Sequence, residues 1–229
     1  MKKTTTILCL GIALCMLGCS DDDDQVTTTS TVPFSLTASL SPRSSDAEDT
    51  GILQGNWDAN SQLAVIKTGS SGVPKSILTR KTDSSDTFTG NLSTLVKNEN
   101  EIAVFYPAAA ITANSSDTLT QTLNLSGQDG TLAGITNYDY LWAQCKAGMN
   151  ETTGSSACEM TSLVTIGKFQ FTVNGGSPLN NITRITITAT AGTLYSSAVM
   201  KLKNGEFSST QTGNITIKNK AGISGTTYR

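Results

Sequence analysis

The residues that could catalyse a reaction in this chain are carboxylates, lysines and tyrosines, because its 229 residues include no histidine. The absence of imidazole excludes a Ser-His-Asp or Cys-His nucleophile and any metal site built on histidine. Two carboxylate pairs could in principle hydrolyse a glycosidic bond, namely Asp46 with Glu48 and Asp83 with Asp86. Both pairs lie in serine-rich stretches that lack the apolar surroundings needed to raise a carboxyl pKa. We therefore expect solvated groups, and we predict a protein that is not an enzyme and holds no cofactor and no metal.

Cys19 is the residue whose surroundings predict chemistry most directly. Lys2 and Lys3 precede an apolar run, residues 7–17, which is shorter than the roughly 20 residues needed to span a bilayer. Residues 16–19 read Met-Leu-Gly-Cys, which resembles the lipobox at which a bacterial signal peptidase cuts before a cysteine that becomes lipidated. Residues 1–18 are thus predicted to be a lipoprotein signal peptide, with Cys19 carrying the lipid anchor in the outer membrane. The alternative is an ordinary cleaved signal peptide followed by an incidental cysteine.

Four aspartates, Asp21, Asp22, Asp23 and Asp24, follow Cys19 directly. A run of like charges is typical of a solvated spacer, and an acidic run in this place resembles the surface-export signal of Bacteroidota lipoproteins. A calcium site is disfavoured, because consecutive carboxylates lack the alternating ligand spacing of a calcium loop. Residues 19–31 are therefore predicted to form an acidic, threonine-rich tether.

Cys145 and Cys158 are the two cysteines that lie beyond the targeting segment. In an exported protein two such thiols indicate a disulfide. It would close a polar loop, residues 146–157, and stabilise the fold by roughly 3 kcal/mol. The alternative is two unpaired thiols.

Short strands are the elements that must position these residues. Apolar and polar residues alternate strictly from Val32 to Leu40, which predicts a strand with one buried face. Pro33 suits the start of that strand or a sheet edge, because proline has no N–H to donate. Charged residues make up only 15% of the chain and runs with helical spacing are missing, so we predict an all-β fold. Further strand candidates are 63–66, 76–80, 87–92, 101–106, 119–125, 138–143, 163–173, 182–189, 194–202, 206–207 and 214–218.

A series of landmarks in a fixed order resembles the fimbrillin family of Bacteroidota, whose members build type V pili. The landmarks are the lipobox and acidic tether, Pro42-Arg43, Trp57 with 58–66, Ala103–Pro107, Leu123–Gly130, Tyr138–Ala143, and 168–171 followed by 182–187. The resemblance implies two tandem transthyretin-like or immunoglobulin-like β-sandwich domains, residues 32–157 and 158–229. The second domain would be short or truncated, with four or five strands against about seven in a complete sandwich.

The resemblance also implies a function. The chain would be exported as a lipoprotein to the cell surface, and an arginine-specific protease would remove the first strand by cutting after Arg43. The subunit would then join other fimbrillin subunits by strand donation and serve cell adhesion. Anchor-type members of the family keep their lipid and are not cut, and a lone loop arginine is the alternative interpretation of Arg43.

A second interpretation is a surface glycan-binding lipoprotein of a polysaccharide-uptake system. Aromatic residues could stack on sugars, although aromatics beside strands more often fill a core; the candidates are Trp57, Tyr138, Tyr140 and Trp142. A host or glycan receptor is a partner under either interpretation. Nucleic acid is not an expected partner, because the formal net charge is −2 and no basic stripe is present.

Overall fold

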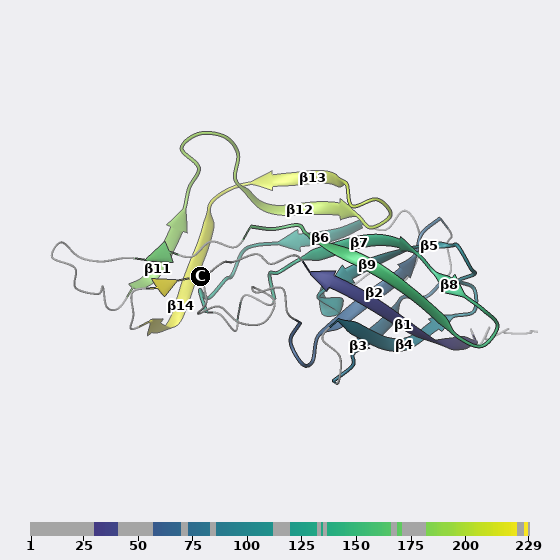
Figure 1. Ribbon diagram of the computed structural model, residues 1–229. Coiled ribbons are helices and arrows are strands. Elements are labelled where there is room, and N and C mark those ends of the chain that lie inside the picture. The colour runs from purple at the N-terminus through teal and green to yellow at the C-terminus, as the bar shows by residue number, and fades with distance from the viewer. Residues whose placement is uncertain are drawn as a thin grey trace, which may run out of the picture.

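The structure is a computed structural model that describes residues 30–40, 57–69, 73–82, 86–111, 120–131, 134, 137–165, 169–170, 182–223 and 227–228. Several predicted sites lie outside these residues: Cys19, the aspartates at 21–24, Arg43, Asp46, Glu48 and Asp83. Within the described part, the regular elements are β-strands and one 3-10 helix, which confirms the all-β class (Figure 1). No helix in these ranges is both long and apolar enough to cross a membrane.

Along the chain, the elements of the described part run from β1 to β15. They are β1 (Thr31–Leu40), β2 (Gln62–Lys67), β3 (Ser76–Arg80), β4 (Thr87–Ser93), β5 (Glu101–Tyr106), η2 (Ala108–Ala110), β6 (Thr120–Asn124), β7 (Leu141–Lys146), β8 (Gly148–Met149), β9 (Gly154–Ser162), β10 (Phe169–Gln170), β11 (Ile182–Ile187), β12 (Tyr195–Lys201), β13 (Phe207–Thr212), β14 (Ile215–Ile223) and β15 (Thr227–Tyr228).

The first part of the chain forms a sheet that closes on itself. Its strands follow the order β1-β4-β3-β2-β5-β7-β9, and hydrogen bonds between β1 and β9 join the two ends, while β8 attaches to β9. The neighbours in this ring are antiparallel except β1 and β9, which are parallel. The expectation of a sandwich is not confirmed, because the pairing of β1 with β9 joins the edges that two facing sheets would leave open.

The inside of the closed sheet is an apolar core. Alternate residues of a strand point to the same face, so the alternation of β1 places Phe34, Leu36 and Ala38 inside. The residues that meet them there are fully buried, among them Leu63, Leu78, Phe88, Leu92, Ile102, Val104 and Leu141. Burial of this apolar surface is the main driving force that holds the ring together.

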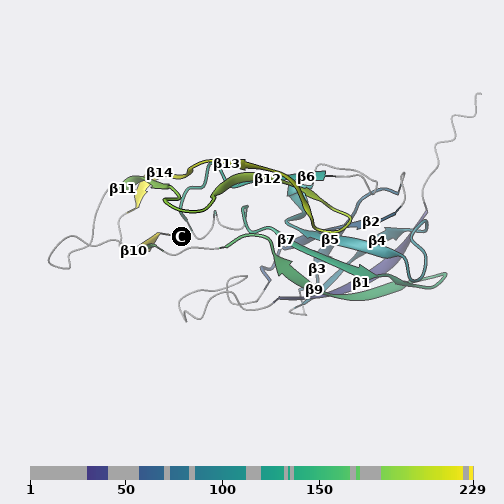
Figure 2. The ribbon, with the colours of Figure 1, turned by 90° about the horizontal axis from the view of Figure 1, so that it is seen from above.

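A second layer covers the outer face of β2 and β5. The three-stranded sheet β13-β12-β6 lies on this side, as Figures 1 and 2 show. A second core cluster fills the space between the layers, with Ile66 and Phe105 from the closed sheet and Leu123, Met200 and Leu202 from the covering layer. Strands buried on both faces need continuous apolar sequence, which explains the runs Leu63–Ile66 and Ile102–Tyr106.

The boundary predicted between residues 157 and 158 falls inside β9. Cys158 to Met160 pair with Ala38 to Leu40 of β1, so these residues belong to the closed sheet. In the other direction, β6 pairs with β12, which joins residues 120–124 to the later part of the chain. The two-stranded β11-β14 sheet lies away from the closed sheet, at the left of Figures 1 and 2.

Candidate functional site

The candidate site is the cleft that β1 fills between β4 and β9. Seven residues of β1 pair with β4, from Thr31 with Ser93 to Thr37 with Thr87. Seven residues also pair with β9, from Phe34 with Gly154 to Leu40 with Met160. We call the facing edges of β4 and β9, with the core side chains that β1 covers, the strand cleft.

Side chains on one face of β1 complete the core above this cleft. Val32, Phe34, Leu36 and Ala38 are exposed by only 8%, 2%, 0% and 0%. The residues between them carry polar or proline side chains that are exposed or half-buried. Pro33 precedes the first residue paired with β9, so its missing N–H removes no hydrogen bond from that side. The predicted strand is therefore confirmed, and it lies inside the sheet rather than at an edge.

Hydrogen bonds beyond the ladders hold both ends of β1. At its start, the carbonyl oxygen of Ser30 accepts from the backbone N–H of Thr94 at 2.9 Å and from the Thr94 hydroxyl at 3.1 Å. At its end, the backbone N–H of Ala38 donates to the carbonyl oxygen of Asp86 at 2.8 Å. The indole N–H of Trp57 donates to the carbonyl oxygen of Ala38 at 2.7 Å.

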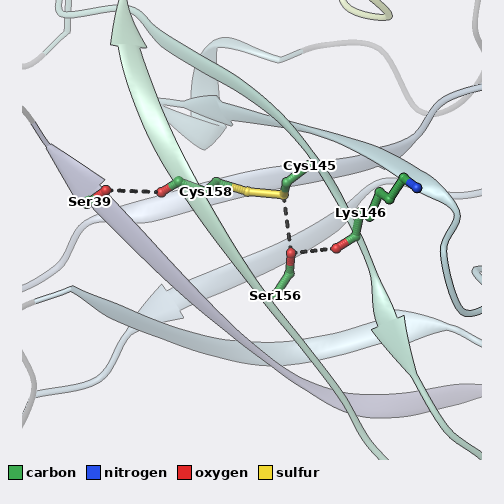
Figure 3. The surroundings of a disulfide bond; sticks show 5 residues. All are labelled: Ser39, Cys145, Lys146, Ser156 and Cys158. Carbon is green, nitrogen blue, oxygen red and sulfur yellow. Dashed lines mark hydrogen bonds between the residues drawn. A yellow bond between two sulfur atoms is a disulfide. The ribbon is translucent and has the colours of Figure 1, made fainter.

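A disulfide between Cys145 and Cys158 joins β7 to β9, with 5.8 Å between the two Cα atoms (Figure 3). β7 and β9 share only two register pairs, Leu141 with Ser162 and Trp142 with Thr161. The two cysteines face each other farther along the same register, so the disulfide holds the strands where the ladder no longer does.

Polar groups around the disulfide connect it to β1. Figure 3 shows the Ser39 hydroxyl of β1 donating to the carbonyl oxygen of Cys158 at 3.4 Å. The Ser156 hydroxyl donates to the carbonyl oxygen of Lys146 at 2.7 Å and lies 3.3 Å from Cys145 Sγ. The prediction of a loop over the polar stretch 146–157 is wrong; the stretch contains β8 and the first residues of β9, because residues 154–157 pair with β1.

The four aromatic candidates for sugar stacking lie in different environments. Trp57 is 2% exposed and packs edge-on against Phe88 and Tyr106, with ring centroids at 4.9 and 5.3 Å. Tyr140 is 6% exposed and its hydroxyl donates to the carbonyl oxygen of Asn124 at 3.2 Å. Burial raises the pKa of Tyr140. Trp57 and Tyr140 are therefore core residues.

The other two aromatic candidates, Tyr138 and Trp142, are half-buried. The Trp142 indole N–H donates to the carbonyl oxygen of Leu202 at 3.1 Å, which ties β7 to the end of β12. Its ring also lies against Gly205, where an added Cβ would meet the indole at 2.9 Å. Trp142 packs against the core cluster between the two layers, whereas Trp57 is enclosed in the core of the closed sheet, so the two indoles do not form one stacking platform. Within the described ranges, no group of three or more His, Cys, Asp or Glu side chains could hold a metal ion.

Comparison with known proteins gives a likeness of fold. No family model matches the sequence, and no curated protein matches it. A solved structure from Bacteroides ovatus ATCC 8483, described as a candidate cell adhesion protein, is similar with a TM-score of 0.53 at 15% identity, over 87% of this chain and 77% of that one. A fimbrial assembly protein from Parabacteroides distasonis ATCC 8503 gives a TM-score of 0.41 at 11% identity, over 86% of this chain and 85% of that one. At 15% identity, the similarity to the Bacteroides ovatus protein establishes a similar fold.

Proposed function

We propose that the protein is a fimbrillin-like subunit or anchor of a cell-surface pilus, assembled by strand donation after export as a lipoprotein. The observation that carries the proposal is the position of β1. This strand is paired along both edges and supplies one side of the core, yet it stands at the start of the described chain, next to the predicted tether and cleavage site.

Removal of β1 would leave a defect that another strand can repair. The edges of β4 and β9 would each lose seven register partners, and the core would lose Phe34 and Leu36. Unpaired strand edges and an apolar cleft are the features that an added strand satisfies, through backbone hydrogen bonds and alternate side chains. Arg43 follows the last residue of β1 by three positions, so a cut there would separate β1 from the rest of the chain.

Two further observations support the proposal. The fold resembles that of a candidate cell adhesion protein from Bacteroides ovatus. The sequence before β1 has the features of a lipoprotein signal, an attachment cysteine at Cys19 and an acidic export segment at Asp21 to Asp24. Lipid at Cys19 would hold the precursor at the outer membrane, and release after Arg43 would free it for assembly with other subunits.

The experiment compares cells that express the native chain, Arg43→Ala and Arg43→Lys, where lysine keeps the charge but is not a substrate for an arginine-specific protease. N-terminal sequencing of native surface protein is expected to begin at Ser44. Both variants are expected to begin at lipidated Cys19, to keep β1 attached and to form no detergent-resistant oligomers. Oligomers that form unchanged with β1 still attached would contradict strand donation. A blocked, lipidated Cys19 in the native pilus-bound chain would identify an anchor.

A further inference from the structure

We propose that the strand cleft selects its occupant by side-chain size: it accepts an aromatic residue where Phe34 lies and, four residues later, a residue no larger than alanine where Ala38 lies. The inference rests on the proposed function, because the occupant that would replace β1 is a β-strand of a partner subunit. This strand would run parallel to β9 and antiparallel to β4, as β1 does.

The wide position lies between two glycines. Phe34 pairs with Gly90 of β4 on one side and with Gly154 of β9 on the other. A Cβ added to Gly154 would collide with Met149 Sδ and would lie 2.7 Å from Phe34 Cδ2, closer than carbon atoms approach, so the Met149 sulfur and the Phe34 ring share the space that any side chain at 154 would need. Gly90 is also fixed as glycine, because an added Cβ would lie 2.6 Å from the carbonyl oxygen of Ile77 in β3. Gly154 therefore leaves room for a large ring at this position of the cleft, and Gly90 on the other side adds no side chain of its own.

The narrow position lies at the other end of the cleft. Ala38 is fully buried and pairs with Cys158, whose sulfur is bonded to Cys145. Trp57 closes the same end, since its indole nitrogen lies 2.7 Å from the carbonyl oxygen of Ala38 and its ring is held between Phe88 and Tyr106. A larger side chain at 38 would have to displace a covalently linked cysteine or a packed indole, and overpacking of this kind is destabilising.

The order of large and small residues fixes the register of the occupant. A slip by one residue would turn the apolar face of any alternating strand to solvent. A slip by two residues keeps the apolar face inside, so alternation alone cannot prevent it. A two-residue slip of the β1 sequence in either direction would leave the space between Gly90 and Gly154 without an aromatic ring and would also place a leucine where Ala38 lies. The cleft therefore specifies both the sequence and the register of a partner strand.

The test is an exchange experiment on the full chain, with a recognition site for a site-specific protease placed within residues 44–50. Cutting leaves β1 in place, so the protein stays folded while an excess of peptide displaces the cut segment. The parent peptide has the sequence of residues 31–40. Three analogues carry the changes Phe34→Ala, Ala38→Leu and, as an exposed control on the same strand, Thr37→Ala.

The Phe34→Ala and Ala38→Leu analogues are each expected to need at least about tenfold more peptide for half-displacement than the parent, a difference that one well-packed side chain can produce. The Thr37→Ala analogue is expected to match the parent within about twofold, as surface changes usually do. Equal displacement by the parent and the two core analogues would overturn the proposal, as would a parent peptide that displaces nothing.

A complementary change in the cleft separates size selection from general damage. In the cut Gly154→Ala protein, the parent peptide is expected to displace β1 less readily, while an analogue with Phe34→Val improves relative to the parent. The reason is that the added methyl takes part of the space that the Phe34 ring shares with Met149 Sδ. A Gly154→Ala protein that weakens every peptide by the same factor would contradict size selection. If the peptides show the expected order but no oligomers form on cells, the pilus proposal fails and size selection by the cleft remains.

Discussion

The indole N–H of Trp57 donates to the carbonyl oxygen of Ala38 at 2.7 Å, one residue beyond the last register pair between β1 and β4. Trp57 thereby continues the hydrogen bonding of β1 at the point where its ladder with β4 ends. The indole is 2% exposed, so this bond has no competition from water, and its loss would leave a buried carbonyl without that donor. A residue outside every strand thus holds the end of the strand that the proposed function would remove.

Trp57→Phe is expected to lower the free energy of unfolding by about 2–4 kcal/mol, since it removes the hydrogen bond and leaves space beside Phe88. Trp142→Phe serves as the matched control, because the Trp142 indole N–H also donates to a carbonyl oxygen, that of Leu202, from a half-buried ring. Its expected loss is about 1 kcal/mol. Urea unfolding measures both. Unchanged stability of Trp57→Phe together with lost polysaccharide retention in an affinity gel would favour glycan binding instead.

Leu36→Ala tests how much of the core depends on β1. Leu36 is fully buried, so truncation to alanine is expected to lower the free energy of unfolding by about 2–5 kcal/mol through lost burial and a residual cavity. Thr37→Ala, on the exposed face of the same strand, is expected to change it by less than about 0.5 kcal/mol. Similar midpoints of urea unfolding for the two variants would mean that β1 contributes little to the core.

The double variant Cys145→Ala, Cys158→Ala is expected to lose roughly 3 kcal/mol of stability, because the crosslink restricts the unfolded chain. Alanine avoids placing a hydroxyl at Cys158, which is 7% exposed. Ser156→Ala is the control that keeps the disulfide and loses the hydroxyl contacts to Lys146 and Cys145, at an expected loss of about 1 kcal/mol. A reducing phosphine should lower the free energy of unfolding of the native protein to that of the double variant. It should leave the free energy of unfolding of the double variant unchanged. A native protein that resists this shift would contradict a stabilising disulfide.

Tyr140 predicts a dependence of stability on alkaline pH. Burial raises its pKa in the folded state, so the folded protein favours the neutral phenol relative to the unfolded chain. This contribution is complete below the unfolded pKa of about 10 and is lost as the pH rises through the higher folded pKa. Urea unfolding between pH 8 and 11 should therefore show a steeper decline for the native protein than for Tyr140→Phe. At pH 8 the phenol is neutral in both states, so the difference in free energy of unfolding between the native protein and Tyr140→Phe reports the lost hydroxyl with its hydrogen bond to Asn124. Parallel curves of unfolding free energy against pH for the two proteins would contradict the prediction.

Sequence alone predicts the elements whose pattern is local. The alternation from Val32 to Leu40 corresponds to β1, and the apolar run after Glu101 corresponds to β5. The position of Trp57 beside a strand favours a core residue over a sugar platform, and Trp57 is buried. In each case neighbouring residues carry the information, because period-two alternation specifies a strand with one buried face.

Closure of the sheet could not be predicted in this way. The pairing of Ala38 with Cys158 joins strands that lie far apart in the sequence, and no pattern within either strand specifies its partner. Residues 154–157 are rich in Gly and Ser, which favour loops, yet pairing with β1 makes them strand. One signal was available for the cleft: isolated glycines such as Gly90 inside a strand pattern indicate close approach of a neighbour.

Under the proposed function, in which the chain carries load in a fibre, the disulfide between β7 and β9 has a mechanical consequence. Tension applied between the chain ends crosses from Cys145 to Cys158 through the two sulfur atoms, so the residues between them bear none of it. The cysteines are 13 positions apart, a span that would contribute roughly 40 Å of extra length if it were pulled straight. An oxidised subunit cannot release this length, whereas a reduced one can, and the extensibility of the fibre would then depend on the redox state of its surroundings.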